Sequence, residues 1–333
     1  MINLILKLPG WLLIFFSSNK QVSLEHRKLH PPFQFILSQI ERLKIDYTVM
    51  HPSEVRASYK AQNETKKLPS DIQTKDHHVE VSNGRILVRE YSSRNVPANS
   101  PALVYFHGGG WVIGSVETHN LVCANLCERM GIKIFSADYR LSPEHKHPTP
   151  LNDSIAAFDW VHDNADKLSV NNKNISVGGD SAGGNLAASL CLSKKEKRQT
   201  MPKAQLLIYP VTDLQFKTQS IQKDCAEGFM LTKSLMEWFA KHYLESQESI
   251  TDPLVSPLLN ESFNDLPSAV VITAGFDPLR DEGNKYAEKL KDANVLTIHK
   301  EYESFIHGFI SYGQVPKVSE AMDEIADSFS SLI

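Results

Sequence analysis

Short apolar runs alternate with helical stretches over most of the chain. The apolar runs lie at 102–106, 132–137, 175–177, 204–208, 269–273 and 295–298. Helical spacing of apolar positions marks 117–130, 150–168, 183–193, 278–292 and 316–331. Continuously apolar strands separated by helices are typical of a mostly parallel sheet with helices on both faces. The pattern therefore predicts an α/β fold.

The region before this alternation predicts two further features. The dipeptide Asn83-Gly84 lies between the β-rich runs 78–81 and 85–88, which is typical of a tight hairpin turn. We expect this hairpin to add antiparallel strands at one edge of the sheet. Upstream, residues 20–70 are predicted to be largely helical, and the polar stretch 60–75 is predicted to be a loop.

Residues 211–264 interrupt the alternation of strands and helices. They contain one helical stretch, 231–244, and no clear strand. We therefore predict one catalytic domain built from residues 71–210 and 265–333, with 211–264 as a cap insertion. The N-terminal helical segment, residues 1–70, is expected to form the other part of this cap.

The first 18 residues are mostly apolar and carry one charge, Lys7. A membrane-spanning helix needs about 20 apolar residues, whereas this run is shorter and is broken by Pro9-Gly10. A secretory signal is disfavoured because the basic start is thin and a small-residue cleavage site is missing. We predict a helix that packs on the protein or lies in a membrane surface.

The composition is that of an ordinary globular protein. Of 333 residues, 41% are hydrophobic and 22% are charged, and the net charge is −4. These values exclude a disordered chain and a multi-span membrane protein, and they give no sign of nucleic-acid binding. The localisation that we predict is cytoplasmic, with membrane-surface association or export left open.

The four cysteines, Cys123, Cys127, Cys191 and Cys225, do not indicate a disulfide framework in a chain of this length. Cys123 and Cys127 lie four residues apart on a predicted helix, but two thiols alone cannot complete a zinc site. We interpret all four as small buried side chains in a reducing cytosol.

Nucleotide-binding, zinc-protease and calcium-loop motifs are missing, so neither a metal nor a cofactor is expected.

The motif G-x-S-x-G occurs once, as Gly179, Ser181 and Gly183, between a short apolar strand and a helix rich in Leu and Ala. This context is typical of a nucleophile elbow, a tight strand-to-helix turn that exposes the serine hydroxyl. The flanking glycines are needed because a side chain would not fit in the crowded turn. A phosphate-binding loop is disfavoured because no lysine follows the glycines.

A serine nucleophile needs a histidine base that is oriented by a buried carboxylate. In folds that contain such a nucleophile elbow, the acidic residue follows the serine in the chain and the histidine follows the acidic residue. Asp277 directly follows a predicted strand and is preferred over Asp281, which is expected to lie inside the next helix. His307 follows the last predicted strand and is the expected base, whereas His299 lies within that strand.

The third requirement is a set of hydrogen-bond donors for the oxyanion that forms in the tetrahedral intermediate. One donor is the backbone N–H of Ala182, the residue after the nucleophile. Others are expected from the loop 107–110, His-Gly-Gly-Gly, which follows the first central strand. His107 is interpreted as a brace for this loop, and His145 and His147 precede the elbow, which argues against them as the base.

Taken together, these motifs resemble the hormone-sensitive-lipase-like carboxylesterases, a group of α/β-hydrolases with HGGG and GDSAGG sequences. The matching segments are 105–111, 138–145, 179–184, 252–253 with 256–257, 275–282 and 307–309. The resemblance implies the α/β-hydrolase fold and a triad of Ser181, Asp277 and His307. It also implies an oxyanion hole formed by Gly109 and Gly110 together with Ala182.

The function that the motifs favour is a serine carboxylesterase with a small-molecule ester as substrate, and the resemblance implies a preference for short- to medium-chain acyl esters. A lipase for longer chains, an amidase and a non-catalytic ligand-binding protein remain alternatives. A peripheral membrane contact and a homodimer are left open. Four apolar residues are candidates for the acyl pocket, with core packing as the alternative: Trp111, Phe229, Met230 and Trp238.

Overall fold

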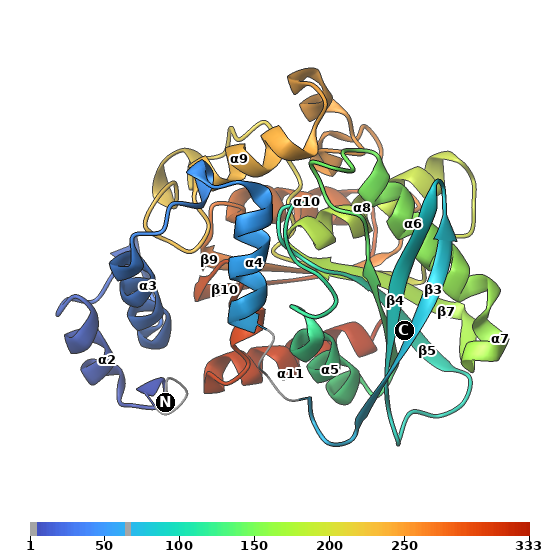
Figure 1. The fold of residues 1–333 in the computed structure, drawn as a ribbon, viewed down its shortest axis with the longest axis horizontal. Helices are drawn as coiled ribbons and strands as arrows, with labels where there is room; N and C mark the ends of the chain where they lie inside the picture. The colour runs from blue at the N-terminus through green and yellow to red at the C-terminus, as the bar shows by residue number, and fades with distance from the viewer. Residues whose placement is uncertain (1–4, 64–67) are drawn as a thin grey trace.

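The computed structural model describes residues 5–63 and 68–333, and an eight-stranded sheet lies at its centre (Figure 1). The order across the sheet is β10-β9-β8-β7-β5-β6-β4-β3. The strands are β3 Ile72–Val81, β4 Gly84–Ser93, β5 Ser100–Phe106, β6 Lys133–Asp138, β7 Val170–Asp180, β8 Ala204–Ile208, β9 Ser268–Phe276 and β10 Thr297–Ile306.

The strands from β6 across to β10 are parallel, whereas β3 and β4 form an antiparallel hairpin at one edge. The turn consists of Ser82 and Asn83, and Asn83 and the following Gly84 have positive φ angles of 61° and 155°. Asn and Gly adopt positive φ more readily than other residues, which explains the choice of these two residues. The predicted α/β fold and the edge hairpin are therefore confirmed.

Helices cover both faces of the sheet. The helices are α2 Gly10–Ser17, α3 Pro31–Leu43, α4 Pro52–Asn63, α5 Asn120–Met130, α6 Thr149–Asp163, α7 Ala165–Leu168, α8 Ala182–Glu196, α9 Lys233–Tyr243, α10 Arg280–Asp292 and α11 Pro316–Ser330. In β5, Val104 and Phe106 pack in a core with α6, α8 and α10, while Leu103 and Tyr105 pack in a second core with α5 and α11. Alternate side chains of one strand therefore fill two apolar layers.

The loop predicted for residues 60–75 is wrong over most of the part that is described. Helix α4 runs to Asn63 and strand β3 begins at Ile72, while 64–67 lie outside the described residues. Strand β3 is at the edge of the sheet and most of its side chains are exposed. Such a strand lacks the apolar alternation by which strands are recognised.

Residues 211–264 connect β8 to β9 through helical turns and α9. The turns are a π-helical segment, Ser220–Asp224, and two 3-10 helices, Gln247–Thr251 and Pro257–Leu259. Helix α9 contacts the 3-10 helix Tyr47–Val49 of the N-terminal segment, so these two distant stretches lie side by side (Figure 1).

The N-terminal segment reaches the ends of β9 and β10. A short antiparallel pair, Ser23–Leu24 with Arg27–Lys28, precedes α3. The buried Arg27 guanidinium donates to the carbonyl of Gly275, and the backbone N–H of His30 donates to the carbonyl of Ser304 at 2.9 Å. The His30 ring also lies 6.0 Å from that of Phe305. In the described residues, no helix is both long and apolar enough to cross a bilayer.

We expect His30 to make the stability of the protein pH-dependent. Burial, with a smaller contribution from Lys317, lowers the pKa of His30 from 6.5 to about 4. Because the unfolded chain then binds this proton more readily, stability should fall as pH decreases from about 6.5 to about 4. His30→Phe should remove roughly 2 kcal/mol of this loss.

Urea unfolding at pH 7 and pH 4.5 of both proteins measures the difference. His107 is also buried, which lowers its pKa to about 3, so the variant should retain part of the dependence. An identical loss of stability in wild type and His30→Phe would contradict the assignment.

Candidate active site

Ser181 lies in the turn between β7 and α8. Its φ of 56° and ψ of −120° place a non-glycine residue in a strained region of backbone conformation, as an elbow requires. A Cβ on Gly179 or Gly183 would clash with the carbonyl of Phe106 in the neighbouring strand. The Ser181 N–H donates to the carbonyl of Ile208 at 2.9 Å. The glycines therefore let the turn pack against β5 while β8 holds the serine from the other side.

Ser181, His307 and Asp277 form one hydrogen-bonded chain. His307 Nε2 lies 2.9 Å from Ser181 Oγ, and His307 Nδ1 lies 2.7 Å from Asp277 Oδ2. Asp277 is fully buried, and the residues Ser181 and His307 are each 8% exposed. Because a carboxylate only accepts, Nδ1 carries the ring proton and Nε2 is free to accept from the serine hydroxyl. The structure thus brings together the three residues that the sequence analysis selected.

The register of the sheet explains this proximity. Phe276 in β9 pairs with Ile306 in β10, so Asp277 and His307 are the next residues of two neighbouring parallel strands. Phe106 in β5 likewise pairs with Gly179 in β7, which sets the loop after β5 beside Ser181. Sites in open parallel sheets are typically found at such carboxyl ends of strands.

Asp277 and Asp281 have different roles in the structure. The second oxygen of Asp277, Oδ1, accepts from the N–H of Leu279 at 2.8 Å, so both carboxylate oxygens are bound. Asp281 lies in α10, where it accepts from the N–H of Ser220 and from Arg280. Only Asp277 of these two is bonded to His307.

The other candidate histidines pack elsewhere. His299 in β10 lies 3.2 Å from the hydroxyl of Thr273, and His147 lies 3.1 Å from that of Tyr243. His107 is fully buried and its ring stacks on Tyr139 with centroids 4.3 Å apart. This packing fits the interpretation of His107 as a brace for the glycine loop.

The loop after β5 has the backbone angles that only glycine adopts readily. Gly109 has φ 121° and Gly110 has φ 57°. The Gly109 carbonyl closes the turn by accepting from the N–H groups of Val112 and Ile113, at 3.1 and 2.9 Å. Ala182 is the first residue of α8, where the helix dipole favours negative charge. The three candidate donors therefore belong to two structures that converge at Ser181.

Asp180 joins these two structures, a role that the sequence analysis missed. Its Oδ1 accepts from the N–H of Gly108 at 3.0 Å and from the Tyr105 hydroxyl at 2.7 Å, and it lies 3.4 Å from Nε2 of His119. Burial alone would raise the pKa of Asp180, but His119 and the Tyr105 hydrogen bond lower it below its usual value. The carboxylate thus stays ionised next to the nucleophile.

The four candidate pocket residues do not form a single group. Trp111 is fully buried and stacks on Tyr243 with centroids 4.1 Å apart. Trp238 lies on α9 and belongs to the same apolar core as Trp111. Phe229 and Met230 are half-buried and pack with the other core, where the Phe229 ring lies 5.2 Å from that of Phe276.

Two aromatic residues that sequence reasoning missed are adjacent to the candidate site. A Cβ on Gly110 would clash with the ring of Phe239 from α9, so this ring lies directly against the glycine loop. Tyr209, which follows β8, places its ring 4.6 Å from that of His307. In the sequence, only the positions of these residues could have pointed to the site. Tyr209 directly follows a strand, and Phe239 is next to Trp238.

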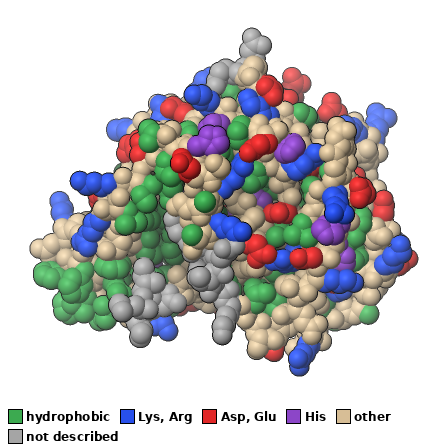
Figure 2. Space-filling view, in the orientation of Figure 1, with side chains coloured by type: hydrophobic (Ala, Val, Ile, Leu, Met, Phe, Trp, Pro, Cys, Tyr) green, Lys and Arg blue, Asp and Glu red, His purple; other side chains and the backbone are tan. Residues whose placement is uncertain are grey.

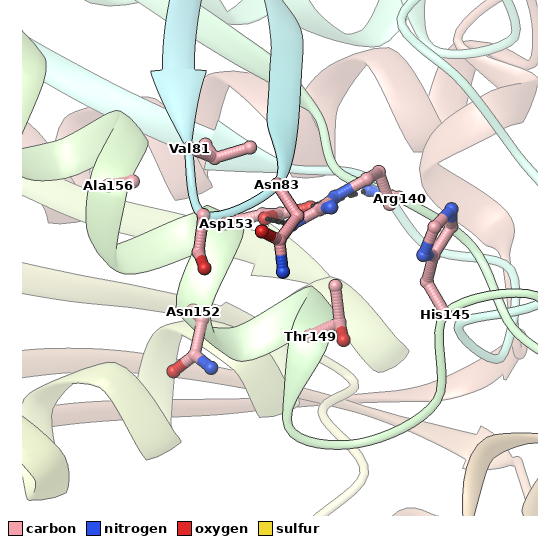
Figure 3. Close-up of a pocket in the computed structure, with 9 residues that line it drawn as sticks. Val81, Asn83, Arg140, His145, Thr149, Asn152, Asp153 and Ala156 are labelled. Atoms are coloured by element: carbon pink, nitrogen blue, oxygen red, sulfur yellow. Dashed lines mark hydrogen bonds and ion pairs between the residues drawn. The ribbon is translucent and has the colours of Figure 1, made fainter.

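A separate hollow of about 460 Å³ lies between the β3–β4 turn and α6 (Figure 3). Asn83 from the turn and Asn152 from α6 line it, together with the ion pair of Arg140 and Asp153, whose atoms Nη2 and Oδ1 are 2.7 Å apart. The charge of Arg140 is therefore already neutralised. The triad residues do not line this hollow. Arg140 follows β6 and Asp153 lies in α6, so we interpret their ion pair as a contact that attaches α6 to the sheet.

Residues 103–311 match a family model for the α/β-hydrolase fold, so the chain belongs to the α/β-hydrolase family. Within the α/β-hydrolases it is a member of the hormone-sensitive-lipase-like carboxylesterases, as the HGGG and GDSAGG motifs indicated.

Two curated relatives and a solved structure are similar to most of the chain. A carboxylic ester hydrolase of Mycobacterium tuberculosis, LipN, is 36% identical over 90% of this chain and 81% of its own. An arylesterase of Saccharolobus solfataricus is 32% identical over 80% and 87%. The structure of an esterase from Pyrobaculum calidifontis aligns with a TM-score of 0.86 and 37% identity, covering 91% of this chain and 98% of that one.

Asp180→Asn tests the link between the elbow and the glycine loop. The amide keeps the shape of the side chain but leaves His119 without its anionic partner, so the loop donors should shift. We expect kcat for p-nitrophenyl butyrate to fall roughly tenfold or more, with a smaller change in KM. The exposed Asp166 of α7 supplies the matched control, Asp166→Asn. A folded Asp180→Asn protein with wild-type kcat would contradict the assignment.

Proposed function

We propose that this protein is a serine carboxylesterase that hydrolyses short- to medium-chain acyl esters through an acyl-enzyme intermediate. The observation that carries the proposal is the unbroken hydrogen-bonded chain from Asp277 through His307 to Ser181. The similarity to ester hydrolases over most of the chain supports it.

Acylation begins when the Ser181 hydroxyl attacks the carbonyl carbon of the ester while its proton moves to His307 Nε2. The carbonyl electrons move to oxygen, and the N–H groups of Gly109, Gly110 and Ala182 stabilise the oxyanion. When the intermediate collapses, the bond to the alkoxide breaks and His307 gives it the proton. An alcohol leaves and the acyl group stays on Ser181.

Deacylation repeats these steps with water. His307 Nε2 takes a proton from a water molecule whose oxygen adds to the acyl carbon. The second tetrahedral intermediate expels the Ser181 oxygen, which takes the proton back from His307. A carboxylic acid leaves, and the enzyme returns to its starting state.

The proposed cap consists of residues 1–70 and 211–264. The contact of α9 with the 3-10 helix Tyr47–Val49 supports a joint role for these two segments. The Phe239 ring against Gly110 supports an acyl site of limited size, because it occupies space beside the proposed oxyanion hole. We therefore favour short and medium chains over long ones.

Burial of the free thiols Cys123, Cys127, Cys191 and Cys225 supports the proposed cytoplasmic location.

Ser181→Ala should lower kcat for p-nitrophenyl butyrate by a factor on the order of 10⁴ or more, because the variant has no nucleophile. Ser189→Ala is the matched control, since Ser189 is a buried serine about two turns further along α8. Stopped-flow and steady-state assays on both variants measure the effect. Wild-type turnover by Ser181→Ala would disprove the proposed nucleophile.

A series of p-nitrophenyl esters tests the proposed chain length. We expect kcat/KM to peak at a short or medium acyl chain and to fall for longer ones, because additional methylene groups would collide with the cap. A rate that keeps rising up to palmitate would favour a lipase. Faster cleavage of a matched anilide than of the ester would favour an amidase.

A further inference from the structure

Large apolar side chains project from the N-terminal helix α2 into solvent. Trp11 is 68% exposed, Phe15 is 59% exposed and Phe16 is 50% exposed. Figure 2 shows hydrophobic side chains gathered at the lower left of the molecule, where Figure 1 places α2. A soluble domain rarely exposes several large aromatic side chains together unless the surface binds something.

These aromatic side chains are held on a folded support. Leu13, on the inner side of α2, is fully buried, and α2 packs against α3. Arg42 near the end of α3 donates to the carbonyl of Phe16 at 3.2 Å, and the rings of Phe15 and Phe16 meet edge to face at 5.5 Å. The exposed aromatic residues therefore belong to a fixed face rather than to a loose tail.

The charge of this segment is opposite in sign to that of the whole protein. Residues 5–44 contain six Lys and Arg and two Glu, whereas the complete chain has a net charge of −4. The exposed cations of this segment are Lys7, Lys20, Lys28, Arg42 and Lys44. Lys and Arg side chains also lie around the hydrophobic surface in Figure 2.

We propose that this N-terminal face, formed by Trp11, Phe15 and Phe16 with Lys7, Lys20 and Arg42, docks on an anionic lipid surface. The aromatic rings of α2 insert at the level of the headgroups, where Trp and Phe are favoured, while the cations bind lipid phosphates. Helix α2, with eight residues, lies in the interface and does not cross the bilayer.

A lipid surface fits this face better than a second copy of the chain. A symmetric contact between two copies would bring the same cations together across the interface, and like charges repel. Anionic headgroups neutralise these cations instead. Docking does not depend on the proposed catalytic function, because the N-terminal face contains no residue of the triad or of the glycine loop.

Sedimentation of the full chain with sucrose-loaded vesicles tests the proposal. One vesicle is phosphatidylcholine alone, and the other also contains about 30% phosphatidylglycerol, both at roughly 0.1 M salt. We expect binding to the anionic vesicle that exceeds binding to the neutral one by about tenfold or more, and that decreases as salt is raised.

The triple variant Trp11→Ser, Phe15→Ser, Phe16→Ser should bind the anionic vesicle at least about tenfold more weakly than the wild type. Leu296→Ser is the matched control, because Leu296 is 64% exposed outside this segment and its loss should leave binding unchanged. Circular dichroism and thermal melting of each variant verify that the protein remains folded.

Three results would overturn the proposal. The first is no binding to either vesicle, and the second is equal, salt-independent binding to both. The third is a wild-type dimer in analytical ultracentrifugation that becomes monomeric in the triple variant while neither protein binds vesicles. That last result would assign the N-terminal face to contacts between copies of the chain.

Discussion

The hydrogen bond between buried Asp277 and His307 is the constraint on which the candidate site depends. A carboxylate without water needs donors, and here they are His307 Nδ1–H and the N–H of Leu279. This arrangement fixes the tautomer of His307, so that Nε2 faces the Ser181 hydroxyl. The pairing of Phe276 with Ile306 supplies the geometry, because it brings the ends of β9 and β10 together. The register of β9 and β10 therefore determines how the His307 ring is oriented toward Ser181.

The N-terminal segment is attached to both sides of this site. Arg27 donates to the carbonyl of Gly275, two residues before Asp277. Arg56 on α4 donates to the carbonyl of Val112, just beyond the glycine loop, and pairs with Glu144, which lowers the pKa of that carboxyl to about 2. The N-terminal segment is therefore hydrogen-bonded both next to the acid loop and next to the glycine loop.

The sequence predicted the parts of the fold and site that depend on local backbone or on chain order. Ser181 was recognisable because its strained turn requires glycines nearby, and His307 because it follows the last strand. The roles of Asp180 and Phe239 were not recognisable, since they arise from contacts with Gly108 and Gly110, which are distant in sequence. The edge strand β3 was partly missed because its exposed residues carry no apolar alternation.

Covalent labelling by an alkyl phosphonate ester, followed by mass spectrometry of the digested protein, tests the proposed triad of Ser181, His307 and Asp277. We predict one adduct per chain, located on the peptide that contains Ser181, and its loss when Asp277→Asn or His307→Ala removes the activation of the serine. An unlabelled protein, or an adduct at another serine, would contradict the proposed triad.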